Sequence, residues 1–263
     1  HRATSAPRPR PTCRGTPPCA IVQRVRLLAV TDLHYRLPLF DWLLSAGADA
    51  DLVALSGDLL DIVTPVPHET QAVVVSTYLR RLAEQTTVAA CSGNHDLDGP
   101  GPLGEQQAGW LAELDVPGLT VDGASLDTGG VRITVAPWWD GPASQAAVEA
   151  QLRAAADDRP ERWIWLYHAP PAGTRLCFDG RRTFPDEALT AWVDELTPDI
   201  VLCGHIHQAP WVDGGGWYDR LGDTVVINPG KQIGKVPPHV WLDTDAGRAT
   251  WSGLGETDGL DLW

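Results

Sequence analysis

The sequence predicts an α/β protein in which two β-sheets pack together and helices cover them from outside. In the first half, short apolar runs alternate with segments of helical periodicity, and in the second half strands dominate. Hydrophobic residues make up 43% of the 263 residues, which is enough to fill a buried core. This length favours a single domain.

The first half alternates strands with helices. Apolar runs predict the strands, and apolar residues at spacings of three and four predict the helices; Tyr78 and Leu82, for example, lie four residues apart. The predicted elements in chain order are strand 25–30, amphipathic segment 39–48, strand 52–55, helix 69–85, strand 87–91, helix 105–114 and strand 119–122.

The second half begins after a turn at Thr128-Gly129-Gly130. The elements predicted there are strand 131–136, helix 143–156, strand 162–167, helix 186–196, strand 200–203 and strands 225–227, 240–242 and 249–251. The helix 186–196 ends before Pro198, because proline cannot continue it. The closing run of strands indicates the second sheet.

The first twenty residues differ from the rest in composition. They hold four arginines, five prolines and no acidic residue, so we expect residues 1–20 to be a disordered tail and residues 21–263 to be the folded domain. Cys13 and Cys19 lie in this tail. Two free thiols are favoured there over a disulfide or a metal pair.

Charge and composition exclude several classes of protein. The net charge of −14 repels phosphate backbones and anionic lipid, which argues against a nucleic-acid coat protein and a lipid-surface binder. No apolar stretch approaches 18 residues, so no membrane span is expected. Arg26 interrupts the first apolar run, and the five cysteines form no ribbon-like pairs. These features predict a reduced, cytoplasmic setting.

Five predicted strands run directly into polar residues of the same kind. In chain order the blocks are Asp32-x-His34, Asp58 with Asp61, Asn94-His95-Asp96, His168 and His205-x-His207. Five of the eight histidines therefore follow a strand. Binding groups gather at the carboxyl ends of strands in α/β sheets, so we expect these side chains to meet in one crevice.

The residue types in these blocks predict a metal centre. Imidazole, carboxylate and amide groups suit Mn²⁺, Fe or Zn²⁺, whereas the absence of thiolate argues against a structural zinc site. The ligands are too many for one ion and suit two ions that share a carboxylate. Gly57 and Gly204 precede ligands, where the backbone must approach the site closely.

The blocks D-x-H, G-D-x-x-D, G-N-H-D, H and G-H-x-H in this order resemble those of the calcineurin-like metallophosphoesterase superfamily. The resemblance spans Asp32 to His207 and implies two mixed β-sheets flanked by helices, an αββα arrangement. It also implies the role of each residue. Asp32, His34 and His207 would hold the first metal, Asp58 would bridge, Asn94, His168 and His205 would hold the second metal, His95 would be the catalytic acid and Asp61 would pair with it.

The implied activity is the hydrolysis of a phosphoester of a small molecule, with nucleotides among the candidates. A metal-bridging hydroxide would attack phosphorus while His95 protonates the departing oxygen, and Asp61 would hold His95 protonated through a hydrogen bond. The motif details favour the group of small bacterial phosphodiesterases and phosphatases over protein phosphatases, purple acid phosphatases and nucleases. The alternative is a metal-bound interaction module without activity.

Three further features border the motif blocks. Arg36 follows His34 and is predicted either to hold a phosphate oxygen or to be a surface residue. Trp138 and Trp139 follow a strand and form either an aromatic wall or ordinary packing, which is favoured. The segment Asn228-Pro229-Gly230 resembles the closing loop of bacterial members of the superfamily, but Lys231 stands where they often have serine.

Overall fold

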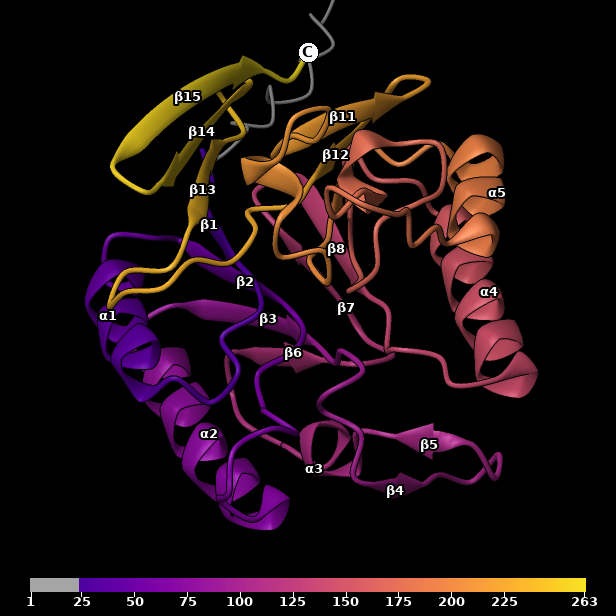
Figure 1. Cartoon of the computed structure of the whole chain (residues 1–263). Coiled ribbons are helices and arrows are strands. Elements are labelled where there is room, and N and C mark those ends of the chain that lie inside the picture. Colours follow the sequence, from indigo (N-terminus) through magenta and orange to yellow (C-terminus); the bar gives the residue numbers. More distant parts are fainter. Residues whose placement is uncertain (1–23) are drawn as a thin grey trace, which may run out of the picture.

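The computed structural model describes residues 24–263, and its larger sheet has seven strands (Figure 1). Four neighbouring strands run parallel, and a C-terminal antiparallel ribbon extends the sheet. The strands in spatial order are β15 (Glu256–Asp261), β14 (Arg248–Gly253), β13 (His239–Asp243), β1 (Arg26–Val30), β2 (Leu52–Ser56), β3 (Thr87–Cys91) and β6 (Leu119–Val121).

The second sheet has six strands, with a parallel centre and antiparallel edges. Its strands in spatial order are β11 (Tyr218–Leu221), β12 (Thr224–Ile227), β10 (Ile200–Leu202), β9 (Arg162–Leu166), β8 (Val131–Val135) and β7 (Ser125–Thr128). A small ribbon of β4 (Gly99–Pro100) and β5 (Gln106–Gln107) stands apart. Both large sheets are therefore mixed, as predicted.

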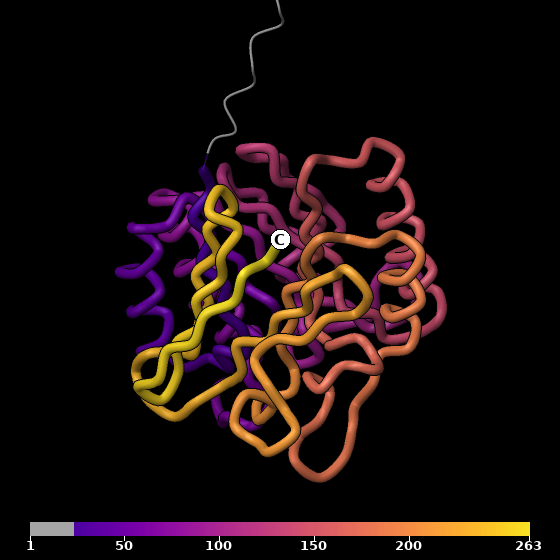
Figure 2. The backbone as a smooth tube through the Cα atoms, turned by 90° about the horizontal axis from the view of Figure 1, so that it is seen from above, coloured from indigo at the N-terminus to yellow at the C-terminus, as the bar shows by residue number. Residues whose placement is uncertain are grey.

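Helices cover the outer face of each sheet (Figure 1). They are α1 (Leu37–Gly47), α2 (His68–Ala83), α3 (Gly109–Ala112), α4 (Pro142–Ala156) and α5 (Glu187–Leu196), with short 3₁₀ turns η1 (Arg175–Cys177) and η2 (Ala209–Trp211). Figure 2 shows the indigo and purple helices on one side of the molecule and the rose and orange ones on the other. The predicted layers, helix–sheet–sheet–helix, are confirmed.

The strands alternate between two buried environments because successive side chains point to opposite faces. In β1, Leu27 and Ala29 face the core between the sheets, which also contains Ile164 of β9. Leu28 and Val30 instead pack under α1 and α2. This double burial explains why the central strands appear in the sequence as continuous apolar runs.

Two predicted details are wrong or incomplete, and a third is not tested. The helix expected at 105–114 is only the single turn α3, because the ribbon strand β5 precedes it and Asp98 accepts hydrogen bonds from the backbone N–H groups of Gly109 (2.7 Å) and Trp110 (3.0 Å). The edge strands β7, β11 and β15 were not predicted, since they are largely polar or exposed and lack an apolar run. The tail predicted at residues 1–20 lies outside the described residues.

Candidate metal centre

The five polar blocks come together at one edge of the packed sheets. β1, β2 and β3 are parallel neighbours, so the residues that follow them emerge at the same edge. β9 and β10 are parallel neighbours in the other sheet, and the rings of His168 and His205 that follow them lie with centroids 5.2 Å apart. Asp58 joins the two sheets, because its Oδ2 atom lies 3.2 Å from His168 Nε2.

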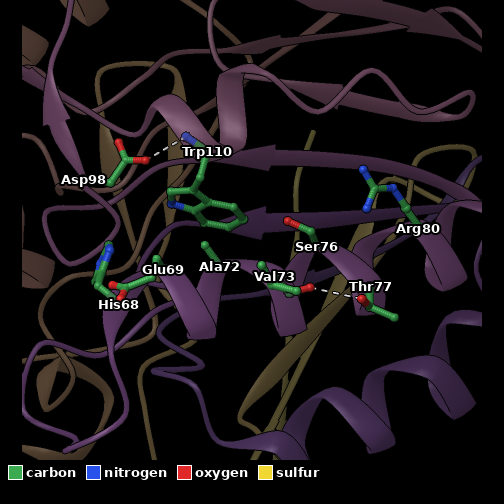
Figure 3. Close-up of a pocket in the computed structure, with 9 residues that line it drawn as sticks. All are labelled: His68, Glu69, Ala72, Val73, Ser76, Thr77, Arg80, Asp98 and Trp110. Atoms are coloured by element: carbon green, nitrogen blue, oxygen red, sulfur yellow. Dashed lines mark hydrogen bonds between the residues drawn. The ribbon is translucent and has the colours of Figure 1, made fainter.

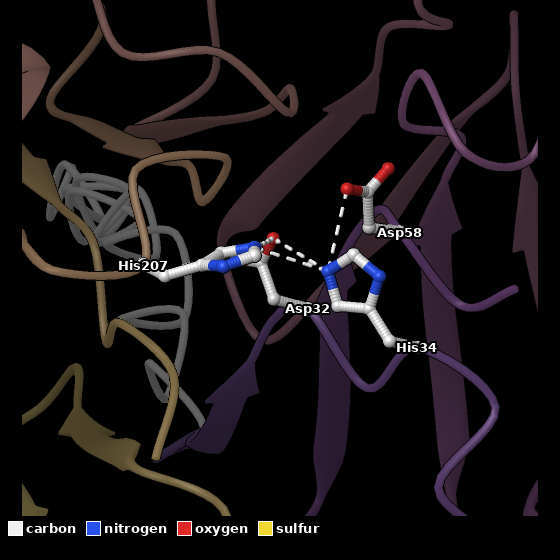
Figure 4. A group of neighbouring side chains, drawn as sticks. All are labelled: Asp32, His34, Asp58 and His207. Atoms are coloured by element: carbon white, nitrogen blue, oxygen red, sulfur yellow. Dashed lines mark hydrogen bonds and ion pairs between the residues drawn. The ribbon is translucent and has the colours of Figure 1, made fainter. Parts of the chain in front are cut away.

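Asp32, His34 and His207 form what we call the first half of the centre. With Asp58 they offer four ligand atoms that lie within 4.8 Å of one another (Figure 4). His207 Nε2 lies 3.0 Å from Asp32 Oδ1 and 3.0 Å from His34 Nε2. His34 Nε2 is 3.5 Å from Asp58 Oδ2. Nitrogen and oxygen atoms that converge in this way have the arrangement of ligands around one cation.

The two carboxylates of this cluster are buried and ionised. Burial raises the pKa of Asp32, but its hydrogen bonds with His207 and His34 outweigh burial and hold the pKa well below its usual value. Burial also raises the pKa of Asp58, and the charge of His168 then brings it below its usual value. Buried anions need positive partners, and in the described part of the chain the ion pairs of these two carboxylates are all with imidazoles.

Asn94, His168 and His205 form what we call the second half. His168 Nδ1 lies 2.6 Å from the carbonyl oxygen of Ser56, so Nδ1 donates there and Nε2 faces the centre. Two buried atoms in this half, Asn94 Oδ1 and His168 Nε2, form no well-aligned hydrogen bond among the described residues, although His168 Nε2 lies within ion-pair distance of Asp58 Oδ2 at 3.2 Å. Buried polar atoms rarely lack a hydrogen bond, and a bound cation is a partner that each of these two atoms could take.

The histidines of the second half have opposite pKa shifts. Burial lowers the pKa of His168, but Asp58 raises it more, and the result is about 9. Burial and the charge of His168 lower the pKa of His205 to about 4. Because Nδ1 already carries the proton that it donates to Ser56, a second proton on His168 binds at Nε2. A metal ion would bind at the same atom, so metal and proton would compete for Nε2.

The backbone at the ligands is strained. Among the described residues seven non-glycine residues have positive φ, and Asp32 (56°), His34 (44°), Asp58 (53°) and His205 (66°) are four of them. Gly57 has φ of +86°, and a Cβ atom there would lie 2.6 Å from His168 Nδ1. The predicted close approach at Gly57 is thus present, and strain concentrated at one site indicates function.

His95 lies against the first half. Its ring centroid is 4.5 Å from that of His34, and its Nε2 atom is 3.9 Å from Asp58 Oδ2. The backbone N–H of Ile62 points to His95 Nδ1 at 3.5 Å. With Nδ1 as the acceptor, the proton of the neutral ring sits on Nε2, which faces the centre.

The expected hydrogen bond between Asp61 and His95 is not present. Asp61 Oδ1 lies 4.0 Å from His95 Nδ1, within ion-pair range only, and accepts instead from the backbone N–H of Val63 at 2.9 Å. The expectation that Asp61 keeps His95 protonated is not supported either. Burial is the largest influence on the pKa of His95 and lowers it, while Asp58 and Asp61 oppose burial without overcoming it.

The sequence analysis assigned no role to three residues that hold the loops of Asp61 and His95. Asp96 is buried and accepts from the backbone N–H groups of Gly93 and Leu60, both at 2.8 Å; burial and then Asp58 raise its pKa to about 7. The buried Gln71 side chain bonds to both the N–H and the carbonyl of Asp61 at 2.8 Å. His68 Nε2 contacts the carbonyl of His95 at 2.8 Å. Of these three residues, only Asp96 could have been found from the sequence, because it belongs to the block Asn94-His95-Asp96.

The two tryptophans after β8 have different environments. The Trp138 ring lies 5.7 Å from that of His168 and 5.5 Å from that of His205, so it borders the second half. Trp139 stacks on Tyr167 at 4.2 Å, with the ring planes 6° apart. The packing interpretation therefore holds for Trp139, and the aromatic wall stays a prediction for Trp138.

A cavity of about 520 Å³ lies outside the centre, between α2 and α3 (Figure 3). Its lining residues are His68, Glu69, Ala72, Val73, Ser76, Thr77, Arg80, Asp98 and Trp110. None of them belongs to either half of the centre. This cavity is therefore separate from the cluster of converging ligand atoms.

The fold and the side-chain cluster are those of a metallophosphoesterase. A family model described as calcineurin-like phosphoesterase matches residues 25–209, which include all five polar blocks, and the protein belongs to this family. No curated protein matches the chain.

Solved structures show the same fold at low sequence identity. The protein TT1561 of Thermus thermophilus superposes with a TM-score of 0.58 at 18% identity, over 92% of this chain and 100% of that chain. Purple acid phosphatase PPD1 from yellow lupin seeds gives 0.56 at 16% identity, over 90% of this chain and 53% of that one. At these identities the likeness concerns the fold alone. Between residues 24 and 263, no helix has the length and apolar character needed to cross a membrane.

Proposed function

We propose that the protein hydrolyses a phosphoester bond of a small molecule at a centre of two metal ions, drawn from Mn, Fe and Zn. The observation that carries this proposal is the cluster of four converging ligand atoms, together with two buried atoms that form no well-aligned hydrogen bond, Asn94 Oδ1 and His168 Nε2. One cation would be held by the first half and one by the second half, with Asp58 shared. Membership of the phosphoesterase family supports the reaction class.

Ions bound in this way lower the pKa of a bound water and neutralise the charge of the phosphoryl oxygens. The protein supplies the rest. His95 Nε2 faces the centre, and in the imidazolium form the ring would give its Nε2 proton to the departing oxygen and be left neutral. The backbone of Asp61 is held by two hydrogen bonds with the Gln71 side chain, and this positions the loop beside His95. The carboxylate of Asp61 contributes a negative charge near the His95 ring.

Two finer assignments belong to the same proposal. Cys91, Cys177 and Cys203 are buried free thiols, which suits a reducing, cytoplasmic compartment. We also propose that residues 21–263 form a single domain, because β1, near its start, pairs with β13, near its end.

The test is the turnover of bis-p-nitrophenyl phosphate by the purified chain with Mn²⁺, Fe²⁺ or Zn²⁺, together with metal analysis. We expect two metal equivalents and metal-dependent release of p-nitrophenolate. A protein that binds two equivalents but turns over neither this diester nor p-nitrophenyl phosphate would be the non-catalytic module instead.

The role of His95 has its own signature. His95→Ala should lower kcat by about 10²–10⁴-fold on an alkyl phosphoester, whose alkoxide leaves poorly, and much less on a p-nitrophenyl ester. Metal content should stay at two equivalents, and Asp61→Asn should show the same selectivity more weakly. Equal losses on both esters, or loss of metal, would show that His95 is a ligand or a structural residue.

A further inference from the structure

The loop from Asn228 to Val236 is fixed against the first half of the centre. Asn228 Nδ2 donates to the carbonyl oxygens of Gly204 (3.0 Å) and Ile206 (3.1 Å). The backbone N–H of Lys231 donates to the carbonyl of His207 at 3.1 Å. Trp211 Nε1 donates to the carbonyl of Lys231, also at 3.1 Å. The main chain of Lys231 is thus held at both of its polar groups, beside a residue of the first half.

The whole chain contains only two lysines, and both lie in this loop at positions 231 and 235. Lys235 is exposed, but Lys231 is half-buried, and the negative charges of Asp32, Asp61 and Asp58 act on its ammonium group. Burial nevertheless lowers the pKa of Lys231, because these charges do not fully replace the lost water.

No described carboxylate forms an ion pair with Lys231. Asp32, Asp58 and Asp61 pair with histidines instead. A second cation, Arg36, lies on the same side, where its guanidinium donates to the carbonyl of Gly234 in the loop at 3.2 Å and opposes the charge of Lys231. Two partly buried cations placed together repel each other, and an anion between them would remove that cost.

The kind of anion follows from the number of charged oxygens on phosphorus. A phosphodiester carries two non-bridging oxygens with one negative charge, which two metal ions can neutralise. A phosphomonoester carries a third terminal oxygen and a second charge, which need another cation. Lys231 lies next to the first half through its backbone hydrogen bond to His207, Arg36 bonds to the same loop, and neither cation forms an ion pair with a described carboxylate.

We propose that Lys231, assisted by Arg36, binds the third terminal oxygen of a phosphomonoester and gives the enzyme a preference for monoesters over diesters. This rests on the proposed function above, since it assumes phosphoester turnover at the same centre. It makes Lys231 a residue that determines the class of substrate.

The kinetic test compares p-nitrophenyl phosphate with bis-p-nitrophenyl phosphate, which share one leaving group. Lys231→Gln should raise KM for the monoester about tenfold, the effect of one charge-assisted hydrogen bond, and change the diester less than twofold. Lys231→Arg should restore most of the difference. Lys235→Gln, which removes the same charge from the same loop, should leave both substrates unchanged. Equal changes on the two substrates, or the same effect at Lys235, would overturn the proposal.

A binding test does not depend on turnover. Inorganic phosphate, titrated calorimetrically into the metal-loaded full chain, should bind Lys231→Gln about tenfold more weakly than the wild type or Lys235→Gln. Because the chain has two lysines, amine acetylation followed by mass spectrometry reports each separately. Phosphate should protect Lys231 and not Lys235.

The outcomes separate the two proposals. Absence of turnover on both esters in the wild type, together with the expected phosphate binding and protection, would remove the hydrolase function and keep the anion site. Turnover with unchanged phosphate affinity in Lys231→Gln would keep the hydrolase and remove the role of Lys231.

Discussion

The two halves of the metal centre are built from different chemistry. The first half has its own carboxylate, Asp32, and its ring nitrogens and carboxylate oxygens contact one another at 3.0–3.5 Å. The second half consists of an amide and two imidazoles, and its Asn94 Oδ1 and His168 Nε2 atoms form no well-aligned hydrogen bond among the described residues. It has no carboxylate of its own, and negative charge reaches it from Asp58, which lies 3.2 Å from His168 Nε2, and from Asp32.

This difference in ligand charge gives the two halves a reason to bind metal ions with unequal affinity. An anionic ligand offsets the charge of a cation, whereas neutral ligands only solvate it. We therefore expect the first half to bind its ion more tightly than the second half. Asp58 should matter most, because it is the group that both halves share.

Replacement of the shared residue should have the largest effect. Asp58→Asn removes the negative charge that faces both His34 and His168. It should reduce bound metal and lower turnover by about 10³-fold or more, since metal ions supply several kcal/mol of transition-state stabilisation. Metal analysis and bis-p-nitrophenyl phosphate kinetics measure both. The exposed Asp127→Asn is the control, and a variant with two metal equivalents and near-native turnover would refute the shared role.

Stepwise removal of the metal ions should show directly that the two halves differ in affinity, with a smaller effect than that of Asp58→Asn. When the loaded protein is dialysed against increasing chelator, we expect two steps, with the ion of the second half leaving first. Asn94→Ala should abolish the weaker step and keep the tighter one, whereas Asp32→Asn should abolish the tighter one. Metal content after each step is the measurement, and a single step in the wild type would show that the halves are equivalent.

The difference in metal affinity between the two halves should become smaller when the second half gains a carboxylate. Asn94→Asp keeps the shape of the side chain and adds one negative charge, so the weaker ion should bind about tenfold more tightly. Turnover should fall at the same time, because a more negative centre attracts the anionic substrate less. Unchanged metal affinity would mean that charge does not set the difference between the halves.

The layers and the convergence of the polar blocks could be predicted from the sequence more fully than the surroundings of each side chain. Each proposed ligand follows an apolar strand, and this signal is local, so the layers and the meeting of the blocks could be predicted. The partners of Asp61 could not, because the backbone N–H of Val63 and the side chain of Gln71 in α2 contact it through hydrogen bonds that leave no pattern in the sequence. The position of Lys231 beside the first half could not be predicted either. It depends on the hydrogen bonds from the Asn228 side chain to the carbonyl oxygens of Gly204 and Ile206.

The smallest expected effect is on the pH dependence of stability, and it concerns Asp122, whose carboxyl group lies near the second half but is not one of its ligands. Asp122 Oδ1 accepts from the backbone N–H of Ser92 at 2.8 Å, and Ser92 Oγ accepts from the N–H of Trp138 at 3.0 Å. Burial raises the pKa of Asp122 to about 6, despite the hydrogen bonds from Ser92. Near the second half this acid is thus protonated in mild acid, in contrast to the ionised Asp32 of the first half.

The sign of the pH effect follows from that shift. The pKa of Asp122 is higher in the folded chain than the unfolded value of 3.8, so its contribution to stability is complete below pH 3.8 and is lost as the pH rises through about 6. Asp122→Asn keeps the acceptor for Ser92 but cannot ionise. The fall in Tm between pH 5 and pH 8 should therefore be about 3 °C smaller in this variant, which corresponds to about 1 kcal/mol after allowance for partial exposure. Identical pH profiles of Tm would show that Asp122 is ionised throughout, and that the second half, like the first, is supported by charge.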